Sequence, residues 1–396
     1  MSKLYQWQAT NAQGERLRGH LHCTGPQQAR LQLDRQGLSQ VRLRRTHDAL
    51  LPALRARDIT LFTRQLATLL GAGLPLLQAL QLLSVGLKHP RLQQLLVSLQ
   101  TSLESGLSLS AACAQHPHCF SQVYVQLVAA GEQSGLLDVM LTRLAAHLES
   151  TQALQAKVRA ALTYPIAVML VAAVVVGILM VKVVPTFSQV FASHGSALPW
   201  PTLLVIGMSD WLQTYGLWLL PTVPLCVWAT LRVWRRCELC RKAVQKRLWR
   251  WPLVGPLVQQ TSLTRWTRTL ASLCAAGVPL VPSLASAGQA AGHVVFEEAS
   301  VQLMQDIQQG QALSQAMGGL QLYPPMVLQL CAVGEASGTL DEMLAKAADF
   351  LDVQVQSRLA SLMSLLEPAL MVVLGSLIGG MVVAMYLPIF NMGQVI

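Results

Sequence analysis

The sequence has few charged residues. Asp, Glu, Lys and Arg make up 12% of its 396 positions, whereas hydrophobic residues reach 53%. That charged share is about half the usual level for soluble globular proteins, which excludes a purely soluble protein and indicates an integral membrane protein. The first 160 residues nevertheless carry Arg, Gln and Asp at a spacing typical of an exposed surface, so a soluble part is also expected.

Motifs of catalysis and cofactor binding are also lacking. No Gly-x-x-x-x-Gly-Lys-Ser/Thr loop occurs, so the protein is not expected to hydrolyse ATP itself. The eight cysteines are scattered, and the lone Cys-x-x-Cys, Cys237-Glu238-Leu239-Cys240, has no second pair or His pair at zinc spacing. A metal there stays an open alternative, but we expect no cofactor and no metal. Met1 to Gln6 lacks the apolar segment of a signal peptide, so no cleaved signal is expected.

A long apolar run follows a polar helical stretch near the middle of the chain. Between Ile166 and Val184 only Lys182 is charged. At ~1.5 Å per residue this run spans about 28 Å, close to the hydrocarbon thickness of a bilayer. Lys157 and Arg159 precede it, where cations meet lipid head groups, and Pro165 is expected in the first turn of the span.

Two further uncharged stretches complete the membrane part. One begins at Leu366-Glu367-Pro368, and the other, Trp211 to Leu231, lies between the two runs. Three transmembrane helices are therefore predicted. Residues 185–210 contain no Lys or Arg, whereas the N-terminal region and the segment after Leu231 are rich in Arg. The positive-inside rule then places the N-terminus and the soluble parts in the cytoplasm and the C-terminus on the opposite side.

The formal charge of +10 raises nucleic acid as a partner. The densest basic cluster, however, directly follows an apolar run, which is more typical of a cytoplasmic lipid surface than of a phosphate-binding groove. No direct nucleic-acid partner is expected. The cluster consists of Arg232, Arg235, Arg236, Arg241, Lys242, Lys246, Arg247 and Arg250.

The soluble part begins with a small α+β module and continues as helices. Alternating residues from Tyr5 to Cys23 predict a hairpin, and Ser39 to Leu43 a third strand, with a helix between them. From Asp58 to Arg159 the apolar period becomes helical, and Gly and Pro divide the stretch into six helices. Asp58 is expected to cap the first of them. Short loops favour an antiparallel bundle.

The chain contains an internal repeat. Thr63 to Leu76 recurs as Thr267 to Leu280, and Gly131-Glu132-Gln133-Ser134-Gly135 recurs as Gly334-Glu335-Ala336-Ser337-Gly338. The offset is 204 from Thr63 to Thr267 and 203 from Gly131 to Gly334, so the repeat is a duplicated domain. Two bundles on the same side of a membrane need a returning helix between them, which the middle stretch supplies.

The predicted fold class is mainly α, with two duplicated six-helix cytoplasmic bundles, three transmembrane helices and a small N-terminal α+β module. The expected order is the module at 1–45, the first bundle at 55–160, span 1 at 164–185, a short periplasmic segment at 186–210, span 2 at 211–233, a basic linker at 234–262, the second bundle at 263–362 and span 3 at 366–388.

The most suggestive polar residues are Glu132 and Glu335, each in a Gly-Glu-x-Ser-Gly turn before a long helix. A capping role is the simpler reading, because acids gain from the dipole at a helix N-terminus; a contact with a partner protein is the alternative. Arg64 and Arg268 occupy matching places in the two copies. We hypothesise that each arginine pairs with the glutamate of its own copy.

The remaining candidates are repeated prolines, glycines and serines. Gly135, Gly338, Pro165 and Pro368 complete the set of motif or partner-contact candidates. Ser134 and Ser337 lie in Gly-x-x-Ser-Gly rather than Gly-x-Ser-x-Gly, without a repeated His and Asp, so a hydrolase is disfavoured. Gly375 and Gly379 form a Gly-x-x-x-Gly face that suits close helix packing in the last span.

Three features together resemble one family. They are the duplicated Thr-Arg-x-Leu-Ala start, the duplicated Gly-Glu-x-Ser-Gly turn, and the stretch from Lys157 to Pro185 with Tyr164-Pro165 before the apolar run. The resemblance is to the type II secretion F proteins, the platform proteins of type II secretion systems and type IV pilus machines. It covers nearly the whole chain; Ser121 against Pro324 and Tyr164 against Glu367 are its mild departures.

The resemblance implies a multi-pass protein of the bacterial inner membrane that is not an enzyme. A cytoplasmic hexameric assembly ATPase would engage the bundles, and their movement would lift pilin or pseudopilin subunits into a filament. Other inner-membrane assembly proteins and further copies of the chain, as a homo-oligomer, would be partners too. The rival classes are a small membrane transporter built from a duplicated unit and an intramembrane enzyme; the absence of acids and of mid-depth bases from the apolar runs disfavours both.

Overall fold

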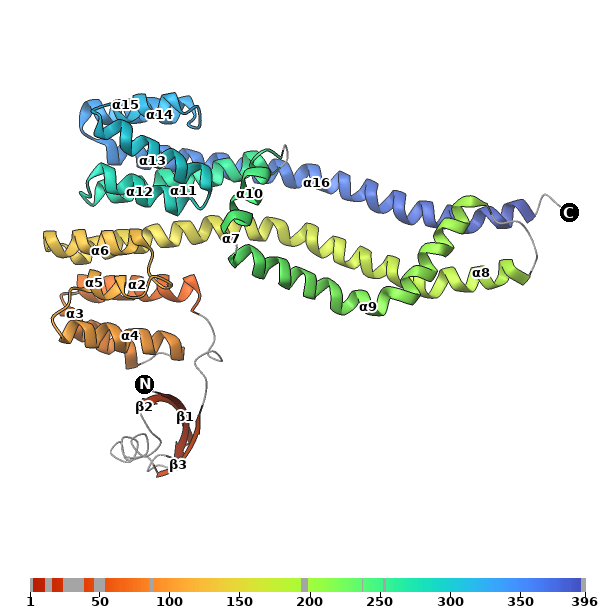
Figure 1. Cartoon of the computed structure of the whole chain (residues 1–396), viewed down its shortest axis with the longest axis horizontal. Coiled ribbons are helices and arrows are strands. Elements are labelled where there is room, and N and C mark those ends of the chain that lie inside the picture. Colours follow the sequence, from red (N-terminus) through yellow and green to blue (C-terminus); the bar gives the residue numbers. More distant parts are fainter. Residues whose placement is uncertain are drawn as a thin grey trace. The chain divides into compact units, whose positions relative to one another are not determined.

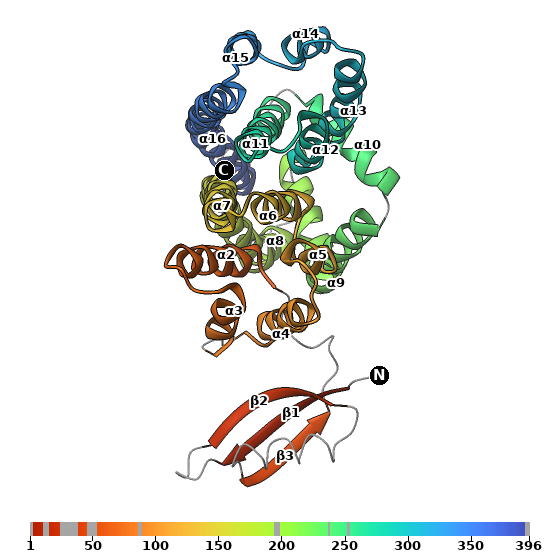
Figure 2. The same ribbon diagram turned by 90° about the vertical axis from the view of Figure 1, so that its left-hand side faces the viewer.

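The computed structural model describes residues 3–10, 16–23, 39–45, 54–85, 89–193, 199–236, 238–251 and 254–392. Near the N-terminus it has three strands, β1 (Lys3–Thr10), β2 (Arg16–Cys23) and β3 (Ser39–Arg45). Both β2 and β3 pair antiparallel with the central β1, as Figure 2 shows. The helix expected between β2 and β3 lies outside the described residues, so the α+β module stays a prediction.

The first helical repeat consists of short helices that pack in sequence order (Figure 1). They are α2 (Ala56–Gly71), α3 (Leu76–Val85), α4 (Pro90–Glu104), α5 (Leu109–Ala114) and α6 (Gln122–Ser134). Turn residues fix their ends: Gly73 follows α2 with φ +83°, Pro90 is the first residue of α4, and Ser108 caps α5 by accepting from the Ala111 N–H.

The start of α2 differs from the expected one. Asp58 does not cap the helix but lies in its first turn, and its Oδ2 accepts a hydrogen bond from the Arg55 N–H at 2.9 Å. The helix therefore begins at Ala56. A carboxylate three residues after the cap position satisfies a free donor as well as a cap does, and sequence alone separates the two placements poorly.

The second repeat has the same order of helices. They are α11 (Gly255–Ala275), α12 (Leu280–Ala291), α13 (Val294–Gln308), α14 (Leu313–Gly319) and α15 (Pro325–Ser337). Both repeats continue into a long helix, α7 (Leu137–Ile178) in the first and α16 (Leu340–Met392) in the second. The structure is thus mainly helical, and the series of helices from α2 to α7 recurs as α11 to α16.

Contacts divide the chain into two compact units, one of residues 1–152 and 272–286 and the other of 153–271 and 287–396. In the first unit Phe62, Leu66, Leu96, Leu99 and Leu127 are fully buried. Residues 272–286 of the second copy, which include the first part of α12, belong to this unit, and Ser286 Oγ donates to Gln126 Oε1 at 2.7 Å. The sequence repeat does not predict this exchange, because similarity between copies says nothing of which segments pack together.

The second unit contains the rest of the helices. The segments η2 (Leu179–Val183, a π-helix), α8 (Val184–Ser193), α9 (Trp200–Arg236) and the basic helix α10 (Glu238–Trp249) connect α7 to α11. Among the described residues, two helical stretches are long and apolar enough to cross a membrane, Leu137–Gln189 and Leu340–Pro388. The stretch in α9 is not one of them, so the third span stays a prediction.

Prolines lie deeper in these helices than expected. Pro165 was predicted in a first turn, but it lies inside α7, and Pro368 and Pro388 lie inside α16. The helix in each case starts more than a turn earlier, in the soluble part, and runs without interruption into the apolar stretch. A proline inside a helix removes one backbone hydrogen bond and is tolerated in membrane helices.

The segments η2 and α8 share one core with α16. Met180, Val184, Met381 and Met385 are buried together, with Val205 of α9 packed against them. The Met180 carbonyl, in the π-helical turn, accepts a hydrogen bond from Ser209 Oγ at 2.5 Å. A π turn breaks the regular backbone ladder, and a side-chain hydroxyl here satisfies a carbonyl that the irregularity exposes.

Candidate functional site

The repeated Gly-Glu-x-Ser-Gly sequence forms the same turn in both copies. The last glycine of each motif ends a helix in the left-handed conformation, with φ +69° at Gly135 after α6 and φ +71° at Gly338 after α15. Each donates its N–H to the carbonyl of the first glycine of its motif. Glycine is needed at this position because the left-handed region costs other residues about 1 kcal/mol or more.

The first glycine of the motif allows two helices to approach closely. A Cβ added at Gly131 would lie 3.0 Å from Met140 Cβ, and one added at Gly334 would lie 2.8 Å from Leu340 Cα. The backbone of α6 therefore packs directly on the start of α7, and α15 packs on α16 in the same way. The motif bends the chain tightly where a short helix passes into a long one.

The glutamate of the motif caps a different helix from the one expected. Glu132, near the end of α6, accepts hydrogen bonds from the N–H groups of Leu109 and Ser110 at 2.5 and 3.2 Å, at the start of α5. Glu335 accepts from Leu313 and Ser314 at 2.5 and 2.9 Å, at the start of α14. Each glutamate thus does cap a helix N-terminus. The capped helix is α5 or α14, earlier in the chain than the motif, and not the long helix that follows it, so the contact depends on tertiary structure.

The proposed pairing of Arg64 with Glu132 is wrong. Arg64 forms a two-pronged ion pair with Glu149 of α7, with Nε–Oε1 at 2.8 Å and Nη2–Oε2 at 2.6 Å. This hydrogen-bonded pairing lowers the pKa of the Glu149 carboxyl and raises that of the Arg64 guanidinium. Glu149 lies outside the repeated Gly-Glu-x-Ser-Gly motif, so that motif does not point to it.

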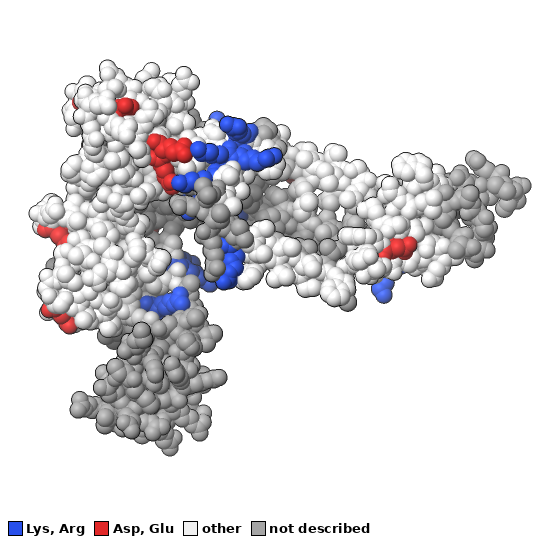
Figure 3. All heavy atoms as spheres, in the orientation of Figure 1, with Lys and Arg blue, Asp and Glu red and all other residues white. Residues whose placement is uncertain are grey.

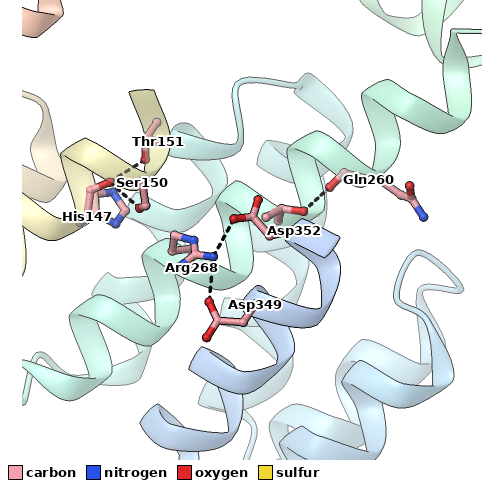
Figure 4. Close-up of polar contacts among 8 residues, drawn as sticks. His147, Ser150, Thr151, Gln260, Arg268, Asp349 and Asp352 are labelled. Carbon is pink, nitrogen blue, oxygen red and sulfur yellow. Dashed lines mark hydrogen bonds and ion pairs between the residues drawn. The ribbon is translucent and has the colours of Figure 1, made fainter. Parts of the chain in front are cut away.

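The second copy has the corresponding pair. Arg268 of α11 lies between Asp349 and Asp352 of α16, with Nη2 at 3.0 Å from Asp349 Oδ1 and 3.1 Å from Asp352 Oδ2 (Figure 4). Asp352 is 203 residues after Glu149, so it occupies the repeat position of that glutamate. Alignment of the two copies therefore predicts an acidic residue at both of these positions. The pairing of Arg268 with Glu335 is likewise replaced, since Glu335 binds the backbone of α14.

The serines of the motif bond to their own helices. Ser134 Oγ donates to the Ala130 carbonyl at 2.8 Å, and Ser337 Oγ donates to the Val333 carbonyl at 2.7 Å. The glutamate and the serine of each motif thus have backbone partners within the bundle. Together with the glycines, they fix the turn between a bundle and its long helix.

The glycines proposed for span packing have open surroundings. A Cβ added at Gly375 or Gly379 would meet nothing within 4 Å among the described residues. Packing of this face on another helix stays a prediction. Cys237 of the Cys-x-x-Cys lies outside the described residues, so a metal at that pair stays untested.

These features define a class of protein: a duplicated helical bundle in which each copy is continuous with a long apolar helix. The model of the family "Type II secretion system (T2SS), protein F" matches residues 62–185 and 266–388, and that of its N-terminal domain matches residues 1–44. The chain belongs to the type II secretion system protein F family.

Relatives with assigned names cover nearly the whole chain. The type IV pilus assembly protein PilC of Pseudomonas aeruginosa is 40% identical over 92% of this chain and 98% of its own length. The type 4 fimbrial assembly protein PilC of Pseudomonas putida is 42% identical over 100% of this chain and 99% of its own. The type II secretion system protein F of Pseudomonas aeruginosa is 34% identical over 87% and 84%.

Proposed function

We propose that the protein is the inner-membrane platform of a type IV pilus or type II secretion machine. The observation that carries this proposal is the match of the family model to both copies, together with relatives named for pilus assembly and for secretion. The greater identity to the pilus proteins, 40–42% against 34%, favours a pilus machine.

The proposed role is mechanical coupling rather than catalysis. A cytoplasmic hexameric assembly ATPase would push on the bundles, and the long helices would carry the movement to pilin or pseudopilin subunits in the membrane. The glycine-fixed turns and the Arg64–Glu149 pair support this role, because a lever must be rigid where a bundle joins its helix. Other inner-membrane assembly proteins and further copies of the chain would complete the platform.

The proposed topology has three spans, with the N-terminus in the cytoplasm and the C-terminus in the periplasm. Its support is the pair of long apolar helices and the basic helix α10. The exposed Arg241 and Arg247 of α10, and Arg250 just after it, suit an anionic cytoplasmic leaflet. Reporter fusions after residues 120 and 320 should report the same side, and a fusion after residue 196 the other. Fusions at 120 and 320 on opposite sides would refute this topology.

In-cell photo-crosslinking tests the function itself. Crosslinkers at the exposed Leu82 and Val301 of the bundles should capture the ATPase, and crosslinkers at the exposed Val171 and Val372 of the apolar helices should capture a pilin. Each pair of positions is the control for the other, since an apolar position within a bilayer cannot reach a soluble ATPase. Capture of neither partner from either pair would refute the platform role.

A further inference from the structure

The second unit contains a cavity of about 650 Å³, lined in part by the residues of α7 and α16 at which these long helices become apolar. Its volume is within the ~300–1,000 Å³ usual for small-molecule pockets. The walls are mostly Leu and Val from four helices, including Leu162 of α7, Leu248 of α10, Leu257 of α11 and Leu362 and Leu366 of α16. A cavity of this size, with walls this apolar, suits a hydrocarbon chain.

One cation lies in this apolar wall. Arg265 of α11 is the only Lys or Arg among the lining residues that the structure describes, and its Nε is buried without a hydrogen-bond partner. No hydrogen bond or ion pair joins Arg265 to another residue in the described part of the chain. Burial lowers the pKa of its guanidinium, but arginine stays charged at neutral pH. A half-buried charge whose Nε is buried without a partner is costly, which points to an anion supplied from outside the chain.

The neighbouring histidine does not supply the missing contacts. His293 Nδ1 accepts from the Val295 N–H at 3.3 Å, and Nε2 lies 3.3 Å from the Gln245 carbonyl, to which it donates. Both nitrogens of the neutral ring thus have partners. Nδ1 caps the start of α13, and Nε2 links His293 to α10. Arg265 is left as the charged group that faces the cavity.

The cavity lies next to the membrane part of the chain and next to a basic surface. Leu162 precedes Pro165 by three residues, and Leu366 and Ala369 flank Pro368, so the lining includes the start of both apolar stretches. Leu248 also lines a second, open hollow of about 950 Å³ that carries Lys246, Arg247 and Arg250. Figure 3 shows Lys and Arg gathered at the surface around α10. Basic pockets at the cytoplasmic side of membrane helices are places where anionic lipid head groups bind.

We propose that this cavity binds one anionic phospholipid, with an acyl chain against the Leu and Val walls and the phosphate at the Arg265 guanidinium. The arginine is present in the second copy alone. Leu61, the repeat position of Arg265, is an exposed leucine. The lipid would fill the space between α10, α11 and α16 and so fix the basic helix against the second bundle. The inference rests on α7 and α16 crossing the membrane as proposed above.

The test is a lipid titration of the purified full-length chain in mild detergent, followed by native mass spectrometry. Phosphatidylglycerol should bind as one retained molecule, phosphatidylcholine with the same acyl chains should bind more weakly, and inorganic phosphate should not bind. Arg265→Gln should weaken phosphatidylglycerol binding about tenfold or more, the size expected from losing a charged hydrogen bond. Ala369→Phe, which adds bulk at the exposed edge of the cavity, should weaken it too.

The matched control is Arg358→Gln, which removes an exposed arginine one residue before Leu359 of the cavity region, and it should bind as the wild type does. Equal losses in Arg265→Gln and Arg358→Gln would mean general surface attraction and overturn the site. Equal binding of phosphate alone would mean a small-anion site, and a dimer that lipid does not displace would mean that a second copy occupies the cavity; both overturn the lipid assignment.

Thermal unfolding separates binding from folding. Phosphatidylglycerol should raise the melting temperature of the wild type and of Arg358→Gln but not of Arg265→Gln. Without lipid, Arg265→Gln should melt no lower than the wild type, because it removes a half-buried charge that has no counter-ion in the described part of the chain. A lower melting temperature would show that Arg265 is a structural residue and would overturn the proposal. The proposed function is judged separately, by crosslinking in cells.

Discussion

The two copies of the bundle share a turn and a set of buried leucines, such as Leu66 and Leu270, but differ in their buried aromatic residues. In the first, Phe62 is buried, and Thr63 Oγ1 lies 3.2 Å from the Tyr124 hydroxyl. In the second, the corresponding positions hold Trp266, whose Nε1 donates to Ser300 Oγ at 2.9 Å, and Thr267, whose buried Oγ1 has no partner in the described residues. The repeat thus keeps its turn and its buried leucines, while the packing around its aromatic residues differs.

This difference shows which features the repeat needs. The Gly-Glu-x-Ser-Gly turn keeps its geometry in both copies, and the arginine keeps an acidic partner on the long helix, because these contacts set how a bundle joins its long helix. Cores tolerate substitution as long as volume and hydrophobicity are preserved, so the two copies can have aromatic residues at different core positions. The aromatic cluster of Trp266, Tyr323 and Phe296 belongs to the second copy.

The largest expected effect comes from emptying the repacked core. Trp266→Ala should destabilise the protein by an amount toward the top of the ~3–5 kcal/mol range for buried aromatic residues, since it also removes the hydrogen bond to Ser300. Phe62→Ala at the matching position should cost less. Urea midpoints of the full chain in detergent give the comparison, and an equal or greater loss in Phe62→Ala would contradict it.

The close helix approach gives a second, smaller contrast. Gly334→Ala should destabilise by about 2 kcal/mol, because the new methyl group would meet the Leu340 backbone at 2.8 Å, which cannot move aside easily. Gly131→Ala should cost less, since its nearest atom is the Met140 side chain at 3.0 Å. Thermal unfolding in detergent measures both. Gly375→Ala, with nothing within 4 Å, is the control and should leave the melting temperature unchanged.

Removing the acidic caps should have an effect of about 1–2 kcal/mol in each copy, because two backbone donors lose their acceptor. Glu132→Ala should cost more than Glu335→Ala, since Glu132 Oε2 also accepts from the Ser110 hydroxyl at 2.5 Å. Hydrogen exchange of the α5 and α14 amides should rise in the respective variants. Faster exchange in α7 or α16 instead would mean that the acids cap the following helix after all.

The smallest effect concerns pH and the surface arginine pair. The pKa of Glu149 is lowered in the folded state, so its contribution is present above the ordinary carboxyl pKa and is lost as the pH falls through the lowered value. The wild type should be more stable than Glu149→Gln at pH 7, by less than about 1 kcal/mol because the pair is exposed to solvent, and no more stable near pH 3. Asp349→Asn, which leaves Asp352 beside Arg268, should show a smaller difference at pH 7. A difference independent of pH would contradict the ion pair.

The sequence by itself determined the repeat, the order of the helices and the two long apolar stretches. Turn glycines, prolines and the hydrophobic period act locally, so the bounds of α4 and the ends set by Gly73 and Gly135 follow from neighbours in the chain. The family also follows from these local motifs. The exact start of α2 and the position of Pro165 in its helix did not, because several placements satisfy the same local rules.

Only the tertiary structure decided which polar residues meet. Glu132 reaches α5 across 22 to 23 positions and Arg64 reaches Glu149 across 85, and no local pattern distinguishes these partners from the nearer repeated ones. The same holds for Arg265, which reads as one more basic residue in sequence. Its missing partner becomes visible only when the helices that enclose it are in place, because burial is a property of the packed chain.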